Sequence, residues 1–438
     1  MRSRIFPLLI LVFCLPATLV LAGDDPAMPD QLWNIHFQMT ILPQYHGSFP
    51  AQYSGKLSLS DQPEFPASFT STLFLGLKGW DGGFLYADPE VPAGSGFSGV
   101  SGLADFSNGE ISKVGSASPT YNQARLYFQQ VFGLGGEKES IDDDQNQLAV
   151  HQDVSRITVT AGKFSLTDFF DNNAYAHDAR AQFINLALVD DLTWDYAADT
   201  HGYTIGVVAE LNQKEWAFRI CSALVSTAAN GPVYDWNIGS ARADNAELEW
   251  RYGGDKTPGK LRFLAYVNHA HMGSYQDALD ASSVDPSVVS TRAYREKYGF
   301  SLNWEQGLNP DLGVFARMGW NDGTTESWEL TAVDQQASLG AVLKGTAWGR
   351  GDDQVGLGVV INGLSSVHQA YLEAGGLDFI IGDGALNYAP EEVAELYYLY
   401  KPAKTIGLTL DLQGVNDPAY NQDRGPVGII SGRFHFEI

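Results

Sequence analysis

Charged and aromatic side chains recur at every second position of several segments of this 438-residue chain. In the segment 246–252, for example, Glu247 and Glu249 alternate with Leu248 and Trp250. Guanidinium groups donate hydrogen bonds in a planar fork, carboxylates accept them, and tyrosine rings offer flat apolar faces. Such a mixture can hold a polar solute weakly, or its members can simply pair with one another. The candidate residues on these polar sides are Arg125, Tyr127, Arg156, Arg219, Glu247, Glu249, Arg251, Arg262, Arg317, Glu395 and Asp411.

A second group of candidates lies in the segment 164–183, where the alternation stops. A long loop that folds inward would need such polar groups to fix itself to the surrounding wall and narrow the opening. The plainer interpretation is an Asn/Asp-rich turn that caps the neighbouring strands. The residues concerned are Asp168, Asp171, Asn172, Asn173, Tyr175, His177, Asp178 and Arg180.

Three further groupings give weaker indications of chemistry. Glu247 and Glu249 form a carboxylate pair of the kind that glycosidases use, but nothing in the sequence implies a cleft around them. His269 and His271 share a strand face without a third metal ligand, and the acidic run 142–144 is more typical of a solvated loop than of a calcium site. We therefore predict no catalytic residues, no metal site and no cofactor.

The alternation itself predicts β-strands with one apolar and one polar face. It is strict in the segment 32–41, where apolar residues such as Trp33 and Ile35 flank polar ones such as Asn34 and His36. The same pattern returns in the segments 125–132, 156–161, 246–252, 297–305, 312–321, 406–413 and 433–438.

Two architectures produce such strands: a soluble sandwich with its apolar faces in a core, and a membrane barrel with its apolar faces toward lipid. Strands of about ten residues spread evenly along the chain favour the barrel, and roughly 25 residues per strand gives about 16 strands. Tryptophans near the strand ends also favour it, because aromatic residues gather at membrane interfaces. These are Trp33, Trp80, Trp250, Trp304 and Trp320.

Composition narrows the class further. The formal charge of −25 argues against nucleic-acid binding, which needs a basic surface, and two cysteines cannot build a disulfide framework. Arg2 and Arg4 precede the apolar stretch 5–15, and small residues follow up to Ala22. This is typical of a secretory signal peptide at residues 1–22, which leaves one β-barrel domain at residues 23–438.

Several motifs then resemble the OprB family of carbohydrate-selective porins. They are GKFSLTDFFDNNAYAHDAR at 162–180, WDYAADT at 194–200, FARMGWNDG at 315–323 and DRGPV at 423–427, and the likeness runs in order from about residue 30 to the end. The sequence departs from the family pattern at Ala179, where proline is usual, and at Ile438, where phenylalanine is usual.

The resemblance implies an all-β, transmembrane, antiparallel up-and-down barrel of about 16 strands, with an external loop folded inward. It implies an outer-membrane channel of a Gram-negative bacterium through which small sugars diffuse passively into the periplasm. The lumen candidates would contact sugar, while the partners would be outer-membrane lipid, lipopolysaccharide, the barrel-assembly machinery and, by analogy, further copies of the chain. Nucleic acid is not among them.

Two alternatives stay open. The charge of −25 is compatible with a general or cation-preferring porin, unless acidic loops such as 88–90 and 137–144 carry that charge outside the pore. A secreted β-rich carbohydrate-active enzyme or lectin would have similar strands in a soluble sandwich.

Overall fold

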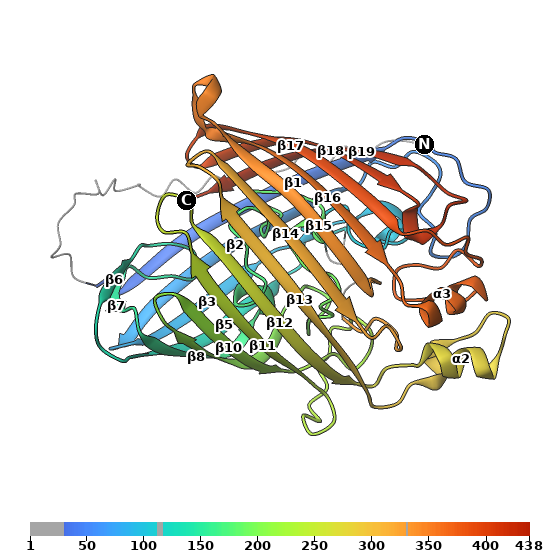
Figure 1. Ribbon diagram of the computed structural model, residues 1–438, viewed down its shortest axis with the longest axis horizontal. Coiled ribbons are helices and arrows are strands. Elements are labelled where there is room, and N and C mark those ends of the chain that lie inside the picture. The colour runs from blue at the N-terminus through green and yellow to red at the C-terminus, as the bar shows by residue number, and fades with distance from the viewer. Residues whose placement is uncertain (1–29, 112–116, 330–331) are drawn as a thin grey trace.

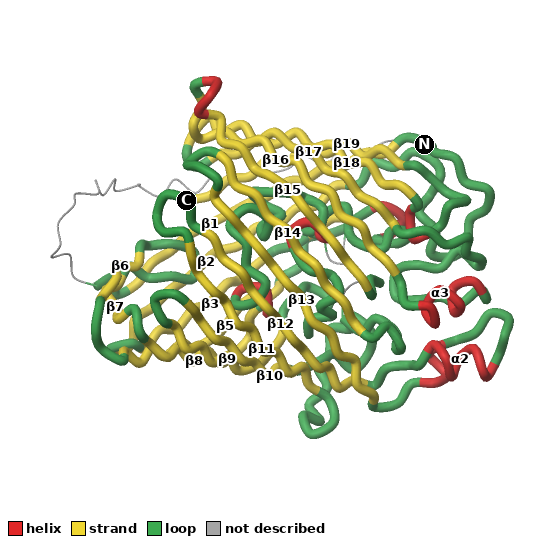
Figure 2. Tube along the Cα trace, in the orientation of Figure 1, coloured by secondary structure: helices red, strands yellow, loops and turns green. Residues whose placement is uncertain are grey.

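The computed structural model describes residues 30–111, 117–329 and 332–438, so the predicted signal peptide lies outside the described residues. In this part of the chain, 16 antiparallel strands form a closed barrel (Figures 1 and 2). They are β1 (Trp33–His46), β2 (Ala67–Trp80), β3 (Gly83–Glu90), β5 (Asn122–Gly133), β8 (Arg156–Phe164), β9 (Thr204–Asn212), β10 (Trp216–Ala223), β11 (Arg242–Tyr252), β12 (Gly259–Ala270), β13 (Arg295–Gly307), β14 (Leu312–Asn321), β15 (Gln335–Gly345), β16 (Arg350–Gly363), β17 (Glu391–Ala403), β18 (Ile406–Asn416) and β19 (Val427–Glu437).

The barrel closes where the first strand meets the last. β1 pairs with β2 along one edge and with β19 along the other, where Thr40 lies opposite His435 and Ile41 opposite Phe434. Every other neighbour in the barrel is antiparallel, and closure leaves no unpaired sheet edge. The predicted fold class is thus confirmed, and a sandwich of two packed sheets is excluded.

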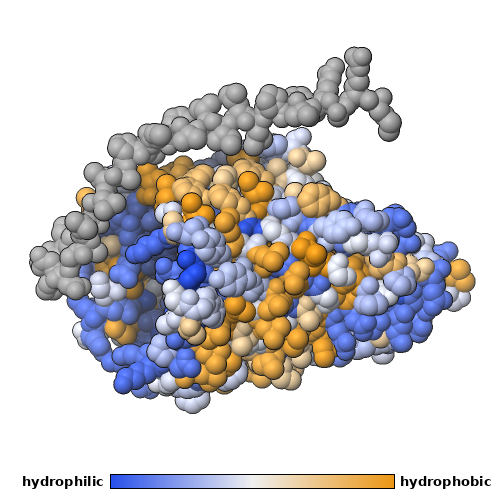
Figure 3. All heavy atoms as spheres, turned by 90° about the horizontal axis from the view of Figure 1, so that it is seen from above, coloured by the Kyte–Doolittle hydropathy of each residue, from blue (hydrophilic) through white to orange (hydrophobic). Residues whose placement is uncertain are grey.

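The strands place their apolar side chains outward and their polar side chains inward, as the alternation predicts. In β11, Leu248 and Trp250 are 48% and 55% exposed, whereas Glu247 and Glu249 are 1% and 3% exposed. On the face that Figure 3 shows, apolar residues gather in the middle of the outer surface, with hydrophilic residues toward both ends. This is the reverse of a soluble protein and the pattern that a lipid environment requires.

Aromatic residues border this band at the barrel end where β1 begins. Trp33, Trp80 and Trp250 are more than half exposed there. The indole nitrogen of Trp304 donates to the hydroxyl of Tyr252 at 2.6 Å, which holds two of these rings together. Such a girdle fits the interface between acyl chains and headgroups.

The two ends of the barrel differ. One end carries long loops and the helices α2 (Tyr275–Ala281) and α3 (Ser366–Glu373), as Figure 2 shows. The other end has mostly short turns and the hairpin of β6 (Lys138–Ile141) and β7 (Val150–Asp153), near the C-terminus in Figure 1. A two-residue strand, β4 (Ala93–Gly94), pairs with β2 beside β3.

One expectation about acidic loops is wrong. Asp88 and Glu90 belong to β3 and are 0% and 4% exposed, so they face the interior instead of lying on a loop. The segment 137–144 does connect strands, at the short-turn end beside Asn34 and His36 of β1, and its residues Glu137 and 142–144 are exposed. The run 88–90 is misplaced because so short an acidic run has no clear alternation.

Candidate functional site

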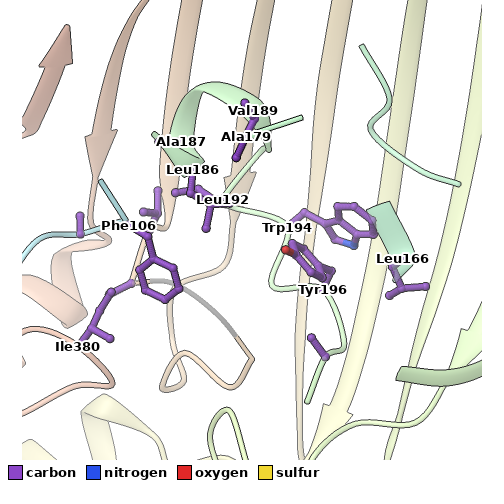
Figure 4. Close-up of a cluster of buried hydrophobic side chains, with 14 of the residues drawn as sticks. Phe106, Leu166, Ala179, Leu186, Ala187, Val189, Leu192, Trp194, Tyr196 and Ile380 are labelled. Atoms are coloured by element: carbon purple, nitrogen blue, oxygen red, sulfur yellow. The ribbon is translucent and has the colours of Figure 1, made fainter. Parts of the chain in front are cut away.

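The segment 165–203, which connects β8 to β9, lies within the barrel against the polar side chains of the wall. It contains the short helix α1 (Leu186–Val189), and every residue from 183 to 200 is buried. Its apolar side chains pack with one another and with the loop that follows β4 (Figure 4). This cluster includes Phe106, Leu166, Leu186, Leu192, Trp194 and Tyr196.

Arg317 of β14 fixes this segment from the wall. Its side chain is fully buried, and its Nε lies 3.0 Å from Oδ2 of Asp171. Its terminal nitrogens donate to the carbonyl oxygens of Leu188 at 2.9 Å and Ala176 at 2.7 Å. Asn303 of β13 donates to the carbonyl oxygen of Asp171 at 2.9 Å. Two predicted candidates, Arg317 and Asp171, thus form one buried ion pair that joins the segment to the barrel.

Wall carboxylates bind the backbone of the same segment. Glu247 accepts from the backbone N–H of Asp171 at 2.8 Å. Glu395 of β17 accepts from the N–H groups of Ile184 and Asn185 at 2.6 and 2.9 Å. The segment has further hydrogen bonds to Tyr266, Glu305, Gln336, Gln413 and Arg433. Its contacts therefore extend along the wall from β11 to β19.

A ladder of ion pairs runs across β10 to β13. Arg219 lies 2.8 Å from Glu247, and Arg262 lies 2.7 Å from Glu249 and 3.0 Å from Glu305. Because these groups are almost fully buried, each charge needs its partner. The charged side chains of this part of the wall are therefore paired with one another.

Three other candidates lie in similar pairs. Arg251 contacts Glu249 at 2.6 Å, and Asp411 accepts from Gln413 at 3.1 Å. Arg156 lies 2.5 Å from Glu139 at the end of the barrel that carries the β6–β7 hairpin. These groups do not line the cavity that lies beside β1, β2 and β5. Asn172 does not line it either, although its side chain is exposed.

That cavity, of about 530 Å³, lies between the inner segment and the wall formed by β1, β2 and β5. The strand residues that line it are Gln38, Phe74, Arg125, Tyr127 and Gln129. Of the predicted candidates, the structure brings together six at this cavity: Arg125, Tyr127, Asp168, His177, Asp178 and Arg180. The open space is therefore eccentric, beside the part of the barrel wall that runs from β1 to β5.

Arg125 faces the cavity in a fork of carboxylates. It contacts Asp168 through two nitrogens, at 2.7 and 2.5 Å, and Asp88 at 3.3 Å. Its guanidinium also lies over the ring of Tyr203, 5.4 Å from the centroid. Bidentate geometry and the ring hold the guanidinium in one orientation.

Arg180 forms a second centre on the cavity wall. Its Nε donates to Glu110 at 2.7 Å, and its Nη2 lies 3.5 Å from Glu90. Tyr203 donates to the same carboxylate of Glu90 at 3.1 Å and so lies between the two arginines. Thr70 donates to Glu110 at 2.7 Å.

The loop groups beside the cavity have shifted proton affinities. Burial, with help from the charge of Asp171, raises the pKa of Asp190 to about 7. Burial and the nearby charge of Arg317 lower the pKa of His177, which keeps its ring neutral around pH 7. The charge of Asp190, which lines the cavity, is therefore sensitive to pH near neutrality.

Sequence reasoning missed several cavity-lining residues. Gln38 and Gln129 lie on the polar sides of their strands, so the alternation could have revealed them. Glu110, Tyr203 and the turn 145–147 lie in connecting segments, where no periodic signal marks them.

Comparison with known proteins agrees with this architecture. None of the helices in the described part of the chain is both long and apolar enough to cross a bilayer.

A search of curated protein sequences finds no match. The chain resembles the high-pH structure of Pseudomonas putida OprB with a TM-score of 0.70 and 14% identity, over 93% of this chain and 94% of that one. It resembles the outer-membrane channel DcaP of Acinetobacter baumannii with a TM-score of 0.51 and 10% identity, over 93% and 97% of the two chains.

The sequence comparison is more specific than these similarities in fold. The sequence model of the OprB family, described as carbohydrate-selective porins, matches residues 75–438. With the closed barrel and its apolar outer band, this match shows that the chain belongs to the OprB family of carbohydrate-selective porins, a channel of the Gram-negative outer membrane.

Proposed function

We propose that the protein lets small neutral sugars diffuse passively into the periplasm through the cavity beside β1, β2 and β5. The observation that carries this proposal is the paired state of Arg125 and Arg180, each of which is held by carboxylates at the cavity surface. Paired charges offer donors and acceptors to hydroxyl groups without attracting one sign of ion strongly. The rings of Tyr127 and Tyr203 add apolar surface that suits the face of a sugar ring.

The same geometry supports a channel rather than an enzyme. The carboxylates Glu247 and Glu249, which resemble a glycosidase pair in sequence, are bonded to arginines of the wall and lie away from the cavity. We propose that they are structural. The partners of the channel would be lipid and lipopolysaccharide at the outer band and the barrel-assembly machinery during insertion, with self-association as a further possibility.

One observation favours a second function, cation-preferring conduction. The charged groups that line the cavity are two arginines and four acidic residues, namely Arg125, Arg180, Glu110, Asp168, Asp178 and Asp190. An acidic excess raises the local concentration of cations. The two functions are compatible, because ion preference and sugar passage depend on different properties of the same wall.

Planar-bilayer recordings of the purified protein would test both. For the sugar channel, we expect glucose or maltose to interrupt the ion current in a concentration-dependent way, and liposomes to swell in either sugar. The absence of both effects would contradict the proposal. A reversal potential in a salt gradient would measure the cation preference independently.

A further inference from the structure

The turn 142–148, here called the amide turn, enters the barrel from the end opposite to the long loops. It joins β6 to β7, and its backbone closes through reciprocal hydrogen bonds between Asp144 and Gln147 at 3.0 and 3.1 Å. Asn34 of β1 anchors it by donating to Asp143 at 2.8 Å and to the carbonyl oxygen of Gln147 at 2.8 Å. The turn is therefore built into the wall instead of projecting into solvent.

The tip of the amide turn reaches the cavity already described. Gln145, Asn146 and Gln147 all line that cavity, together with Gln38 and Gln129 of the wall. Five carboxamide side chains thus line this cavity, and Nε2 of Gln145 donates to Oε1 of Gln38 at 3.3 Å. The inner segment 165–203 bounds the same space from the long-loop side.

From this arrangement we propose that the amide turn, with Gln38 and Gln129, forms a second saccharide-binding subsite in series with the Arg125–Arg180 region. The inference rests on the proposed function, because it assigns a further site to the same permeant. A carboxamide donates and accepts hydrogen bonds without carrying charge. It can therefore bind the hydroxyl groups of a neutral sugar and release them again.

Unused hydrogen-bonding capacity supports this assignment. Among the described residues, Nε2 of Gln38, Oδ1 of Asn146 and Oδ1 of Asp88 have no hydrogen-bond partner although they are shielded from solvent. Gln38 and Asn146 line the cavity, so a change of rotamer in either side chain would turn its unpaired atom toward a solute there. Gln38 would then supply a donor and Asn146 an acceptor, which together match the dual character of a hydroxyl group.

The amide turn is also linked to the charged region. Asn146 donates to Oδ2 of Asp88 at 2.9 Å, and the same oxygen contacts Arg125 at 3.3 Å. Arg125 in turn binds Asp168 of the inner segment. A sugar that leaves the arginines therefore meets the amides next, without crossing an apolar gap.

The test uses the full-length barrel in planar bilayers, with glucose and maltose as probes of current block. The double variant Gln145→Ala/Gln147→Ala shortens two side chains. It keeps the backbone–backbone hydrogen bonds of the turn but removes the bond from Nε2 of Gln147 to the carbonyl oxygen of Asp142 at 2.9 Å. We expect its sugar affinity to fall by about three- to ten-fold, as expected for the loss of one hydrogen bond. The matched control is Gln276→Ala, which removes an exposed glutamine on α2, and we expect it to behave as the wild type.

A second variant, Gln145→Glu, separates binding from steric narrowing. It keeps the length of the side chain but removes its amide donor, so sugar affinity should fall while channel conductance does not rise. Gel mobility before and after heating shows whether the double variant forms a folded barrel. If it does not, the sugar affinity of Gln145→Glu by itself tests whether the amide turn binds sugar.

The outcomes are distinct. Unchanged sugar affinity in the folded variants would overturn the amide subsite and leave the sugar channel intact. A higher conductance with unchanged sugar affinity would also overturn the amide subsite, because the turn would then be only a steric obstacle. A wild-type channel that neither sugar blocks would instead contradict the proposed function itself.

Discussion

Replacing Arg317 by methionine would remove the main anchor of the inner segment while keeping an unbranched side chain of similar length. Four acceptors on the segment would lose a donor: the carboxylate and carbonyl of Asp171 and the carbonyls of Leu188 and Ala176. Breaking a buried ion pair from one side typically costs about 3–5 kcal/mol. Asp171 keeps its bonds from Asn303 and from the N–H of Asp191, so we expect a loss near the lower end, about 3 kcal/mol.

A loss of that size would raise the detached population of the segment by roughly 100-fold. In single-channel recordings we expect larger and noisier conductance, together with weaker discrimination between glucose and maltose. The matched control is Arg350→Met, which removes an arginine paired with Asp353 at the start of β16, far from the inner segment. If Arg317→Met conducts and selects like the wild type, then the buried pair does not hold the constriction.

Three further predictions concern charge. Arg180→Ala should weaken sugar block and raise the cation preference, because Glu110 and Glu90 lose their counter-charge; equal reversal potentials in variant and wild type would contradict this. Since burial raises the pKa of Asp190 to about 7, cation preference should grow from about pH 5 to about pH 8, and Asp190→Asn should abolish this change in the reversal potential. Burial alone would lower the pKa of His368, but two buried carboxylates raise it to about 9. This contribution to stability is complete below the unfolded pKa of about 6.5 and is lost as pH rises through about 9. The protection of the α3 amides, measured as the exchange rate relative to the intrinsic rate at each pH, should therefore fall there in the wild type but not in His368→Gln.

The sequence predicts which face of the barrel wall each strand residue lies on, but it does not predict which residue that side chain contacts. Period-2 alternation separates Glu247 and Glu249 from Leu248 correctly, because it reflects only which face of a strand meets lipid. Arg125 and Arg317 occupy equivalent places in that pattern, yet Arg125 lines the cavity and Arg317 is buried beneath the inner segment. Their difference depends on how a loop packs across the barrel.

The loops themselves were predicted less well for a related physical reason. The segment 164–183 was marked by its polar residues, and its contacts agree with the interpretation that it binds the wall. The amide turn has no comparable signal in the sequence. The hydrogen bonds from Asn34, about a hundred residues earlier in the chain, fix the position of Gln145 and Gln147. Contacts over such sequence separations have no local periodic signature.

The off-centre position of the cavity divides the wall into two regions with different tolerance to change. Substitutions on β11 to β19 would change the strength with which the wall binds the inner segment. Most of them would therefore alter the assembly of the barrel and the noise of the single-channel current. Substitutions on β1, β2 and β5 would alter which solutes pass while leaving that seat in place. A designer who wished to retune this pore for another solute could therefore vary a handful of positions on β1, β2 and β5 and leave the rest of the barrel as scaffold.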